Sequence, residues 1–322
     1  MRCVCRDWTG AWPERRQLEC HTAKHTEELL AGRICASDVH TVTLVFPDDS
    51  MYRFPDSPLY RGFARRVKFR ATAVLANIWR VYLPGCSFIT DVRPLANAHT
   101  VSLRGCTGVT DVSPLCNVRR LDISHCRGIT NVDALCNVMQ LNMRDCTGVR
   151  SVAALRGVRR LCMADCPLID SLDGLQSIEE LDMSFNCRIT SLEPLRSGGI
   201  RVLCAISCQG IADLAPLHSV RALRISKCHG VRRVAGLHSV RALLMDSCKH
   251  VSSIADDMPL LRVLDMSFCS RIGNIDQLAA QLETLYCAGT RNTLRGVTLH
   301  TAGAAVCRCT CENPAAELAQ WL

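Results

Sequence analysis

Aromatic residues are scarce in this chain: they make up 5% of 322 residues, although 48% of the residues are hydrophobic. A core must therefore be built mainly from Leu, Val, Ile, Met and Cys. No uninterrupted apolar run reaches the ~20 residues that a membrane-spanning helix needs, so we expect no membrane insertion. The first residues, MRCVCRDWTGAWPERR, contain no apolar segment of the kind found in secretory signals.

The common enzyme motifs are also missing. The sequence contains no P-loop glycine run, no G-x-S-x-G, no H-E-x-x-H and no kinase signature. We therefore predict a protein that is not an enzyme, without catalytic, cofactor-binding or metal-binding residues. The net charge of +8 is mild, and alone it is a weak indication of an acidic partner.

One pattern of about 20 residues repeats from about Ile78 to Thr290. Two successive copies are VRRLDISHCRGITNVDALCN, residues 118–137, and VMQLNMRDCTGVRSVAALRG, residues 138–157. The frame L-x-x-L-x-L-x-x-N/C-x-L is the leucine-rich repeat pattern. It predicts a leucine-rich repeat solenoid of about eleven rungs of 20–22 residues, mostly β, with short 3₁₀ or extended segments on the convex side.

One column of the repeat holds most of the informative cysteines. Its members are Cys86, Cys106, Cys126, Cys146, Cys166, Asn186, Cys208, Cys228, Cys248, Cys269 and Thr290. A small side chain at this position turns inward after the strand and can satisfy backbone groups of the turn. We interpret these cysteines as packing residues without disulfide pairing, although the chain has 22 cysteines. Such a thiol-rich core suits a reducing compartment, so we expect a cytoplasmic or, alternatively, a nuclear protein.

The half-turn after the ladder residue begins with a short polar side chain in most copies. Such side chains accept backbone hydrogen bonds and start turns. They are Asp91, Asp111, Asn131, Ser151, Ser171, Ser191, Asp213, Ser253 and Asn274. One connection is longer, because Ser197-Gly198-Gly199 extends the turn that enters the next strand.

Three segments are predicted: residues 1–77 as an N-terminal cap, 78–290 as the repeats and 291–322 as a C-terminal cap. In the first cap we expect a helix over Glu14–Leu30 and strands over Val39–Phe46 and Arg66–Arg70. Asn313-Pro314 should start a short final helix. Two cysteine groups could hold a metal ion, but their spacings match no familiar zinc pattern, so we favour caps without metal. These groups are Cys3, Cys5 and Cys20, and Cys307, Cys309 and Cys311.

The concave face of the sheet is the predicted binding surface, because its outward residues alternate with core residues. On rungs seven to nine these outward positions form an apolar patch of Val202, Ile206, Ala222, Ala242 and Leu244. The charged residues Arg224 and Asp246 lie at neighbouring concave positions. An apolar patch next to polar positions favours a protein or peptide partner.

An edge column repeats arginine on four consecutive rungs, at Arg201, Arg221, Arg241 and Arg262. Like charges stacked about 5 Å apart repel unless they are solvated or paired. The column is therefore either a solvated edge or a docking strip for an acidic segment of a partner. Nucleic acid is not expected on this strip, because no aromatic residues interleave with the arginines.

The segments CTGVTDVSPLCNVRRLDISHC and CRGITNVDALCNVMQLNMRDC resemble the cysteine-containing leucine-rich repeats of trypanosomatid proteins. Those proteins include an expression-site-associated family that joins such repeats to a RING finger, which the N-terminal cysteines here do not match. The tract GVTDVSPLCN also resembles the repeats of bacterial internalins. The pattern and the resemblance together favour a non-catalytic protein-interaction scaffold that binds its partner on the concave face. The alternative is a substrate-recognition subunit of a ubiquitin-ligase-type complex, with residues 1–77 docking an adaptor.

Overall fold

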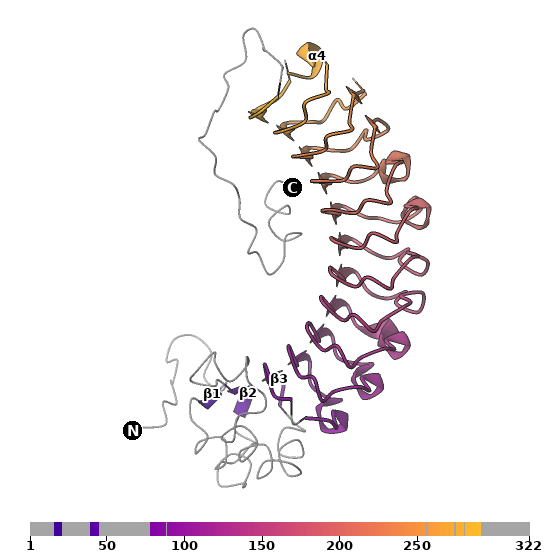
Figure 1. Cartoon of the computed structure of the whole chain (residues 1–322). Helices are drawn as coiled ribbons and strands as arrows, with labels where there is room; N and C mark the ends of the chain where they lie inside the picture. The colour runs from indigo at the N-terminus through magenta and orange to yellow at the C-terminus, as the bar shows by residue number, and fades with distance from the viewer. Residues whose placement is uncertain are drawn as a thin grey trace. The chain divides into compact units, whose positions relative to one another are not determined.

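The computed structural model describes residues 16–20, 39–44, 78–87, 89–255, 257–273, 275–279 and 281–290. The chain divides into two compact units, Met1–Val149 and Arg150–Leu322. In both units the repeats form a leucine-rich repeat β-solenoid, with about ten turns in all. Each turn contains one three-residue strand, a tight turn and a return segment, as Figure 1 shows. The predicted fold class is therefore confirmed.

The first unit contains one parallel sheet in the order β1-β2-β3-β4-β5-β6. Its repeat strands are β3 (Arg80–Tyr82), β4 (Thr100–Ser102), β5 (Arg120–Asp122) and β6 (Gln140–Asn142). Equivalent residues of neighbouring copies pair directly, so that Val81 lies opposite Val101 and Leu121 lies opposite Leu141. The sequence repeat is therefore also the register of the sheet.

Two further strands precede the repeats, and one of them corrects a prediction. Strand β1 (Arg16–Cys20) lies where the sequence predicts part of the helix over Glu14–Leu30. It pairs in parallel with β2 (Val39–Leu44), which pairs in turn with β3. Helical periodicity is a weak prior that pairing with a neighbouring strand overrides. The remainder of that predicted helix, the strand over Arg66–Arg70 and the final helix after Asn313 lie outside the described residues.

The second unit continues the same repeat, with strands in the order β7-β8-β9-β10-β12-β14-β15. These strands are β7 (Arg160–Cys162), β8 (Glu180–Asp182), β9 (Val202–Cys204), β10 (Ala222–Arg224), β12 (Ala242–Leu244), β14 (Val263–Asp265) and β15 (Thr284–Tyr286). The extended turn at Ser197-Gly198-Gly199 does not shift the register, because Glu180 still pairs with Val202. The two extra residues are thus absorbed before the strand begins.

The return segments contain short elements of the predicted kind. There are five 3₁₀ helices among the described residues: η3 (Arg93–Leu95), η4 (Ser113–Leu115), η5 (Asp133–Asn137), η6 (Glu193–Leu195) and η7 (Ala215–Leu217). In the second unit, β11 (Arg233–Val234) and β13 (Ser253–Ile254) pair with each other, and α4 (Asp276–Ala279) is a single helical turn. A repeat of about 20 residues leaves no room for longer convex helices.

Seven of the nine predicted turn-starting side chains accept a backbone hydrogen bond from the residue two positions later, whereas Ser253 lies in β13 and Asn274 is outside the described residues. The amide of Arg93 donates to Asp91 Oδ1 at 3.0 Å, and the amide of Asp133 donates to Asn131 Oδ1 at 2.7 Å. The same contact recurs at Asp111, Ser151, Ser171, Ser191 and Asp213. This local hydrogen bond fixes where each return segment starts.

The ladder residues point into the core, as predicted. The thiol of Cys126 donates to the carbonyl of Leu103 at 3.0 Å, and the thiol of Cys248 donates to the carbonyl of Ile225 at 2.9 Å. Both cysteines are completely buried. Burial raises the pKa of each of these thiols to about 11, so they remain protonated donors at neutral pH.

Asn186 replaces the thiol with a two-way contact. Its Nδ2 donates to the carbonyl of Met163 at 2.8 Å, and its Oδ1 accepts from the amide of Cys166 at 2.8 Å. Where the next ladder residue is a cysteine, the backbone amide of the preceding ladder residue bonds within its own turn instead. The amide of Cys146, for example, donates to the carbonyl of Met143 at 3.1 Å. Asn186 therefore both donates to and accepts from the neighbouring turn, whereas the thiols of Cys126 and Cys248 only donate to it.

The residue just before each ladder position adopts a left-handed backbone conformation. Its amide thereby reaches the next rung: the amide of His125 donates to Arg144, and the amide of Ser247 donates to Ser267. This conformation is unfavourable for residues other than glycine. The non-glycine members of the column are His125, Asp145, Asp165, Phe185, Ser207, Lys227, Ser247 and Phe268.

Candidate functional site

The predicted arginine strip of Arg201, Arg221, Arg241 and Arg262 lies along one edge of the second unit's sheet. The backbone holds the strip in register, because the amide of Arg221 donates to the carbonyl of Arg201 and the amide of Arg241 donates to Arg221, at 2.8 and 2.7 Å. The amide of Arg262 donates in turn to Arg241 at 2.8 Å. Arg201, Arg221 and Arg241 are exposed, whereas Arg262 is half-buried. The repeat thus places four arginines in register along one edge.

Carboxylates accompany the arginines at the two ends of this column. Glu179, one rung before Arg201, lies 3.4 Å from the guanidinium of Arg159. Glu283, one rung after Arg262, lies 3.8 Å from its Nε. Within the described part of the chain, no ion pair involves Arg201 or Arg221. Arg201 and Arg221 therefore carry positive charge that these flanking carboxylates do not neutralise.

The predicted apolar patch is packed more tightly than the sequence suggests. Val202, Ala222 and Ala242 are fully buried and form one cluster with Cys204 and Val263. The prediction that Val202 is exposed for contact is therefore wrong. Apolar side chains at paired positions of neighbouring strands pack against each other.

Two predicted patch residues remain partly accessible. Ile206 and Leu244 are partly buried and pack against the cluster from its margin. The structure therefore assigns most of the patch to packing and leaves only these two side chains partly accessible.

The charged concave residues Arg224 and Asp246 are half-buried, on and just after the strands of this cluster. Asp265 lies on the neighbouring strand, and its Oδ1 accepts a hydrogen bond from the backbone N–H of Ser267 at 2.9 Å. Burial raises the pKa of Asp265, the negative charge of Asp246 acts in the same direction, and Arg224 opposes it. The partly buried position of Asp265 therefore disfavours its ionised form.

Sequence reasoning missed a buried polar group on the other side of the cluster. Asp182 is 1% exposed and its Oδ1 accepts the amide of Ser184 at 3.1 Å. The thiol of Cys162 lies 3.6 Å from Asp182 Oδ2, and Ser184 Oγ lies 3.3 Å from the thiol of Cys204. The signal was present, since LDMSF occurs at both 181–185 and 264–268, around Asp182 and Asp265. Both aspartates close the turn that follows their strand.

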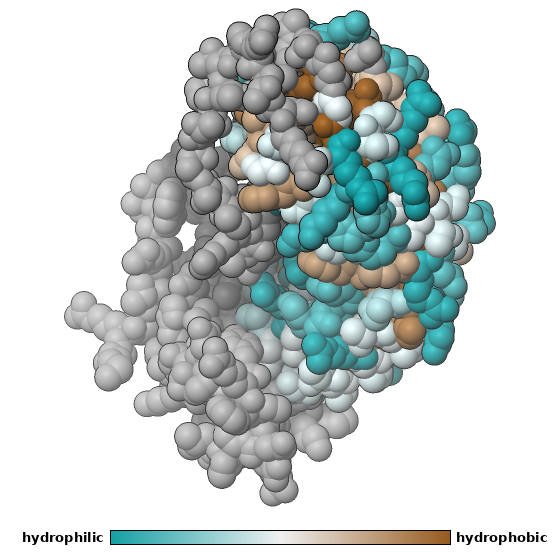
Figure 2. Space-filling model, turned by 45° about the horizontal axis from the view of Figure 1, so that its top comes forward, coloured by the Kyte–Doolittle hydropathy of each residue, from teal (hydrophilic) through white to brown (hydrophobic). Residues whose placement is uncertain are grey.

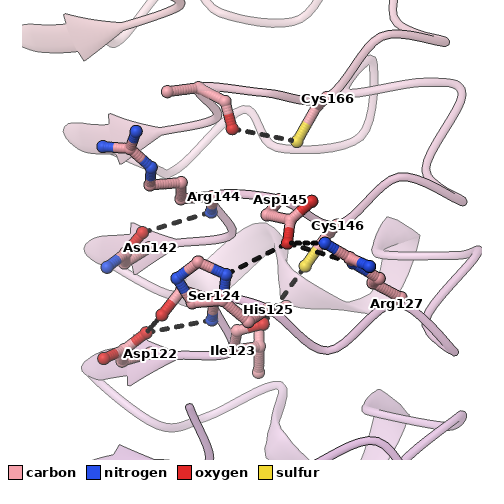
Figure 3. Close-up of polar contacts among 11 residues, drawn as sticks. Asp122, Ile123, Ser124, His125, Arg127, Asn142, Arg144, Asp145, Cys146 and Cys166 are labelled. Carbon is pink, nitrogen blue, oxygen red and sulfur yellow. Dashed lines mark hydrogen bonds and ion pairs between the residues drawn. The ribbon is translucent and has the colours of Figure 1, made fainter. Parts of the chain in front are cut away.

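The first unit carries a separate polar cluster, which Figure 3 shows between two neighbouring rungs. His125 Nδ1 lies 3.0 Å from Asp145 Oδ2, and Arg127 donates to the same oxygen through Nε and Nη2 at 3.0 and 2.8 Å. Burial acts to raise the pKa of Asp145, but the hydrogen bonds from Arg127 and His125 outweigh it, so the pKa is lowered. The cluster ties two rungs together, and no nucleophile is hydrogen-bonded to the His125 ring among the described residues.

A metal site is not evident in the part of the chain that the structure describes. No group of three or more His, Cys, Asp or Glu side chains there could hold an ion. The candidate cysteines at Cys3, Cys5, Cys307, Cys309 and Cys311 lie outside the described residues, and only the backbone of Cys20 is described, in β1. No helix among the described residues is long and apolar enough to span a bilayer.

The surface is mainly polar where Figure 2 displays it. Hydrophilic side chains cover most of the described surface in that view, and hydrophobic atoms occur in separate groups. Among the residues that the structure describes, the large hydrophobic side chains that are exposed are Trp79, Phe185, Leu260 and Phe268. Charge and single aromatic side chains, rather than one wide apolar face, therefore distinguish candidate binding surfaces.

Comparison with protein families supports the repeat class within one segment of the chain. A leucine-rich repeat family model matches residues 115–136. An internalin, InlF of Listeria monocytogenes str. 4b F2365, has a similar structure with a TM-score of 0.46 and 17% identity, over 76% of this chain and 83% of that chain. The functional domain of InlJ from Listeria monocytogenes, which includes a cysteine ladder, gives a TM-score of 0.44 and 11% identity, over 86% of this chain and 63% of that chain. No curated protein sequence matches this chain.

Proposed function

We propose that this protein is a non-catalytic scaffold that binds a protein partner, and that an acidic segment of the partner docks along the arginine strip. The observation that carries the proposal is the in-register stack of Arg201, Arg221 and Arg241, which are exposed. Leucine-rich repeat solenoids in general serve as protein-interaction scaffolds. The exposed positive charge of these arginines favours a partner segment that is acidic.

Electrostatics favour an extended acidic segment on this strip. Adjacent strands are about 4.8 Å apart, so the guanidinium groups form a row with that repeat. Such a row repels itself unless counter-charge is supplied. Guanidinium groups bind carboxylates through paired hydrogen bonds, and a chain of carboxylates can bridge several of them. Ile206 and Leu244 are partly buried against the neighbouring apolar cluster and offer limited apolar contact.

The test compares a strip variant with a matched control. Arg201→Glu combined with Arg221→Glu reverses two charges of the strip, whereas Arg188→Glu combined with Arg156→Glu reverses two exposed charges outside it. Circular dichroism should show that both variants fold. Partners are then captured from a lysate with each variant, and an acidic peptide from any captured partner is titrated directly.

We expect the strip variant to bind the peptide roughly tenfold more weakly or worse, since rim charges each contribute about 0.2–1 kcal/mol and reversal adds repulsion. The control should bind like the wild type. Equal binding by the strip variant and the wild type would reject the strip as the docking site. A captured partner without any acidic segment would reject the proposed chemistry.

A further inference from the structure

The first unit presents an aromatic pair at its edge, beside β3 and β4. The rings of Trp79 and His99 stack with their centroids 4.5 Å apart and their planes 12° from parallel. Trp79 is 45% exposed, although it belongs to a chain with few aromatic residues. The amides of His99 and Thr100 both donate to the carbonyl of Trp79, at 2.9 and 3.1 Å, which fixes the stack to the sheet.

Three arginines surround this pair, and all of them are exposed: Arg80, Arg119 and Arg120. The amides of Arg119 and Arg120 both donate to the carbonyl of His99 at 3.1 Å, so these side chains begin one rung from the imidazole. Burial lowers the pKa of His99, and the charges of Arg119, Arg120 and Arg80 lower it further. The imidazole is therefore a neutral ring at pH 7, and the positive charge of the surface comes from the arginines.

Counter-charge is scarce around these arginines. None of the three forms an ion pair within the ranges that the structure describes. The nearby carboxylate of Asp122 is already hydrogen-bonded to the amide and hydroxyl of Ser124, at 3.0 and 2.7 Å, and to the hydroxyl of Ser102 at 3.3 Å. We call this surface of Trp79, Arg80, His99, Arg119 and Arg120 the Trp79 patch.

We propose that the Trp79 patch binds a single-stranded polynucleotide, with a base against the exposed part of the indole and phosphates on the arginines. The aromatic pair decides between partners. An acidic peptide would bind the three arginines and would not use the aromatic pair. A preformed stack of flat rings beside positive charge is instead the arrangement that accepts a nucleobase. The arginine strip of the second unit lacks such rings, so the two surfaces differ in the partner that they suit.

The probe is a fluorescein-labelled oligouridylate of about twelve nucleotides, and its anisotropy is measured with the full-length protein. A labelled oligoglutamate of equal length serves as the competing class of ligand. Trp79→Ala should weaken oligouridylate binding roughly fivefold or more, since stacking is worth about that much per base. Trp79→Phe keeps a ring and should restore most of the affinity.

Salt dependence tests the role of the arginines. Arg119→Glu combined with Arg120→Glu should weaken binding and reduce the slope of log affinity against log salt by about 0.7 for each phosphate that the variant no longer binds. The control is Arg156→Glu combined with Arg188→Glu, which makes the same charge change on exposed residues of the second unit. It should leave both the affinity and the slope unchanged.

Three results would overturn the inference. The first is oligouridylate binding that Trp79→Ala does not change. The second is oligoglutamate binding that is as tight as that of oligouridylate and that Arg119→Glu combined with Arg120→Glu weakens, which would indicate an acidic peptide site on the Trp79 patch. The third is an equal decrease of binding in the Arg156 and Arg188 control, which would indicate only nonspecific attraction to net positive charge. None of these results decides the role of the arginine strip, which is tested with Arg201→Glu combined with Arg221→Glu and an acidic peptide.

Discussion

Replacing Asn186 with alanine should destabilise the second unit more than replacing it with cysteine. Asn186 is fully buried and makes two hydrogen bonds of 2.8 Å, to the carbonyl of Met163 and the amide of Cys166. A buried hydrogen bond contributes about 1 kcal/mol, and a buried group left without a partner costs about 1–3 kcal/mol. The amide of Cys166 can return to its own turn, as in other rungs, so the expected loss of stability for Asn186→Ala is about 2–3 kcal/mol.

Asn186→Cys should cost less than about 1 kcal/mol, because a thiol can take over one of the two hydrogen bonds. The rungs of Cys126 and Cys208 show how: their thiols donate to the carbonyls of Leu103 and Met183, at 3.0 and 3.1 Å. Urea unfolding followed by circular dichroism gives the midpoint and the slope for both variants, and equal slopes make the comparison valid. Equal destabilisation by alanine and cysteine, or a larger effect of cysteine, would refute the claim that the ladder residue acts by hydrogen bonding to the turn.

Three further predictions concern stability. Gly230→Ala should cost about 1–3 kcal/mol in urea unfolding, since the new Cβ would lie 2.3 Å from the carbonyl oxygen of Ile211, whereas Gly199→Ala, with nothing within 4 Å, should be nearly neutral. Ser247→Gly should stabilise the fold by up to about 1.5 kcal/mol and so raise the melting temperature, because it removes about 1–2 kcal/mol of left-handed strain at φ 60° and adds about 0.5–1 kcal/mol of glycine flexibility. The pKa of Asp265 is raised in the folded state, so its ionisation destabilises the fold as pH rises through the range above the ordinary aspartate pKa. Asp265→Asn should therefore be more stable than the wild type in urea at pH 7 and should lose that advantage at pH 3.

The repeat architecture could be predicted because each column imposes the same physical demand on every rung. The inward position after the strand must satisfy a turn carbonyl, which admits a thiol or an amide, and the structure confirms this at Cys126 and Asn186. The polar residue that opens each return segment was predictable for the same reason. A hydrogen bond that recurs from rung to rung requires a similar side chain at the same position of each repeat.

The sequence predicts the strand over Val39–Phe46, which is β2 in the structure, but periodicity alone could not place the N-terminal strands in the sheet, because long spacers separate them from the array. Strand β2 pairs with β3 in register, with Val42 opposite Val81, although the sequence between them holds no intervening rung of the sheet. The tract VHTVTL at 39–44 is nevertheless similar to AHTVSL at 98–103, and this similarity was the available signal. A search by strand motif, without a fixed step, would have assigned this predicted strand to the repeat sheet.

The burial of Val202, Ala222 and Ala242 could not be read from alternation either. Alternation assigns a residue to a face of the sheet, and it does not show whether that face is covered. The concave face of a solenoid is exposed only where its side chains are not packed against others. Val202 and its neighbours are packed, whereas Arg201 and Arg221 on the adjacent column are exposed.

The edge column is where binding specificity can vary at least cost to the fold. Its backbone is fully used, since the carbonyl of each residue accepts amides from the next rung, as at Trp79, His99 and Arg201. Its side chains leave the sheet at the rim and contribute little to the buried core, so packing accepts tryptophan, arginine or glutamate there. The ladder column has the opposite property, because its side chain must reach a buried carbonyl. The aromatic and basic side chains of the edge column are therefore not explained by folding, and they are the part of the sequence that a partner can account for.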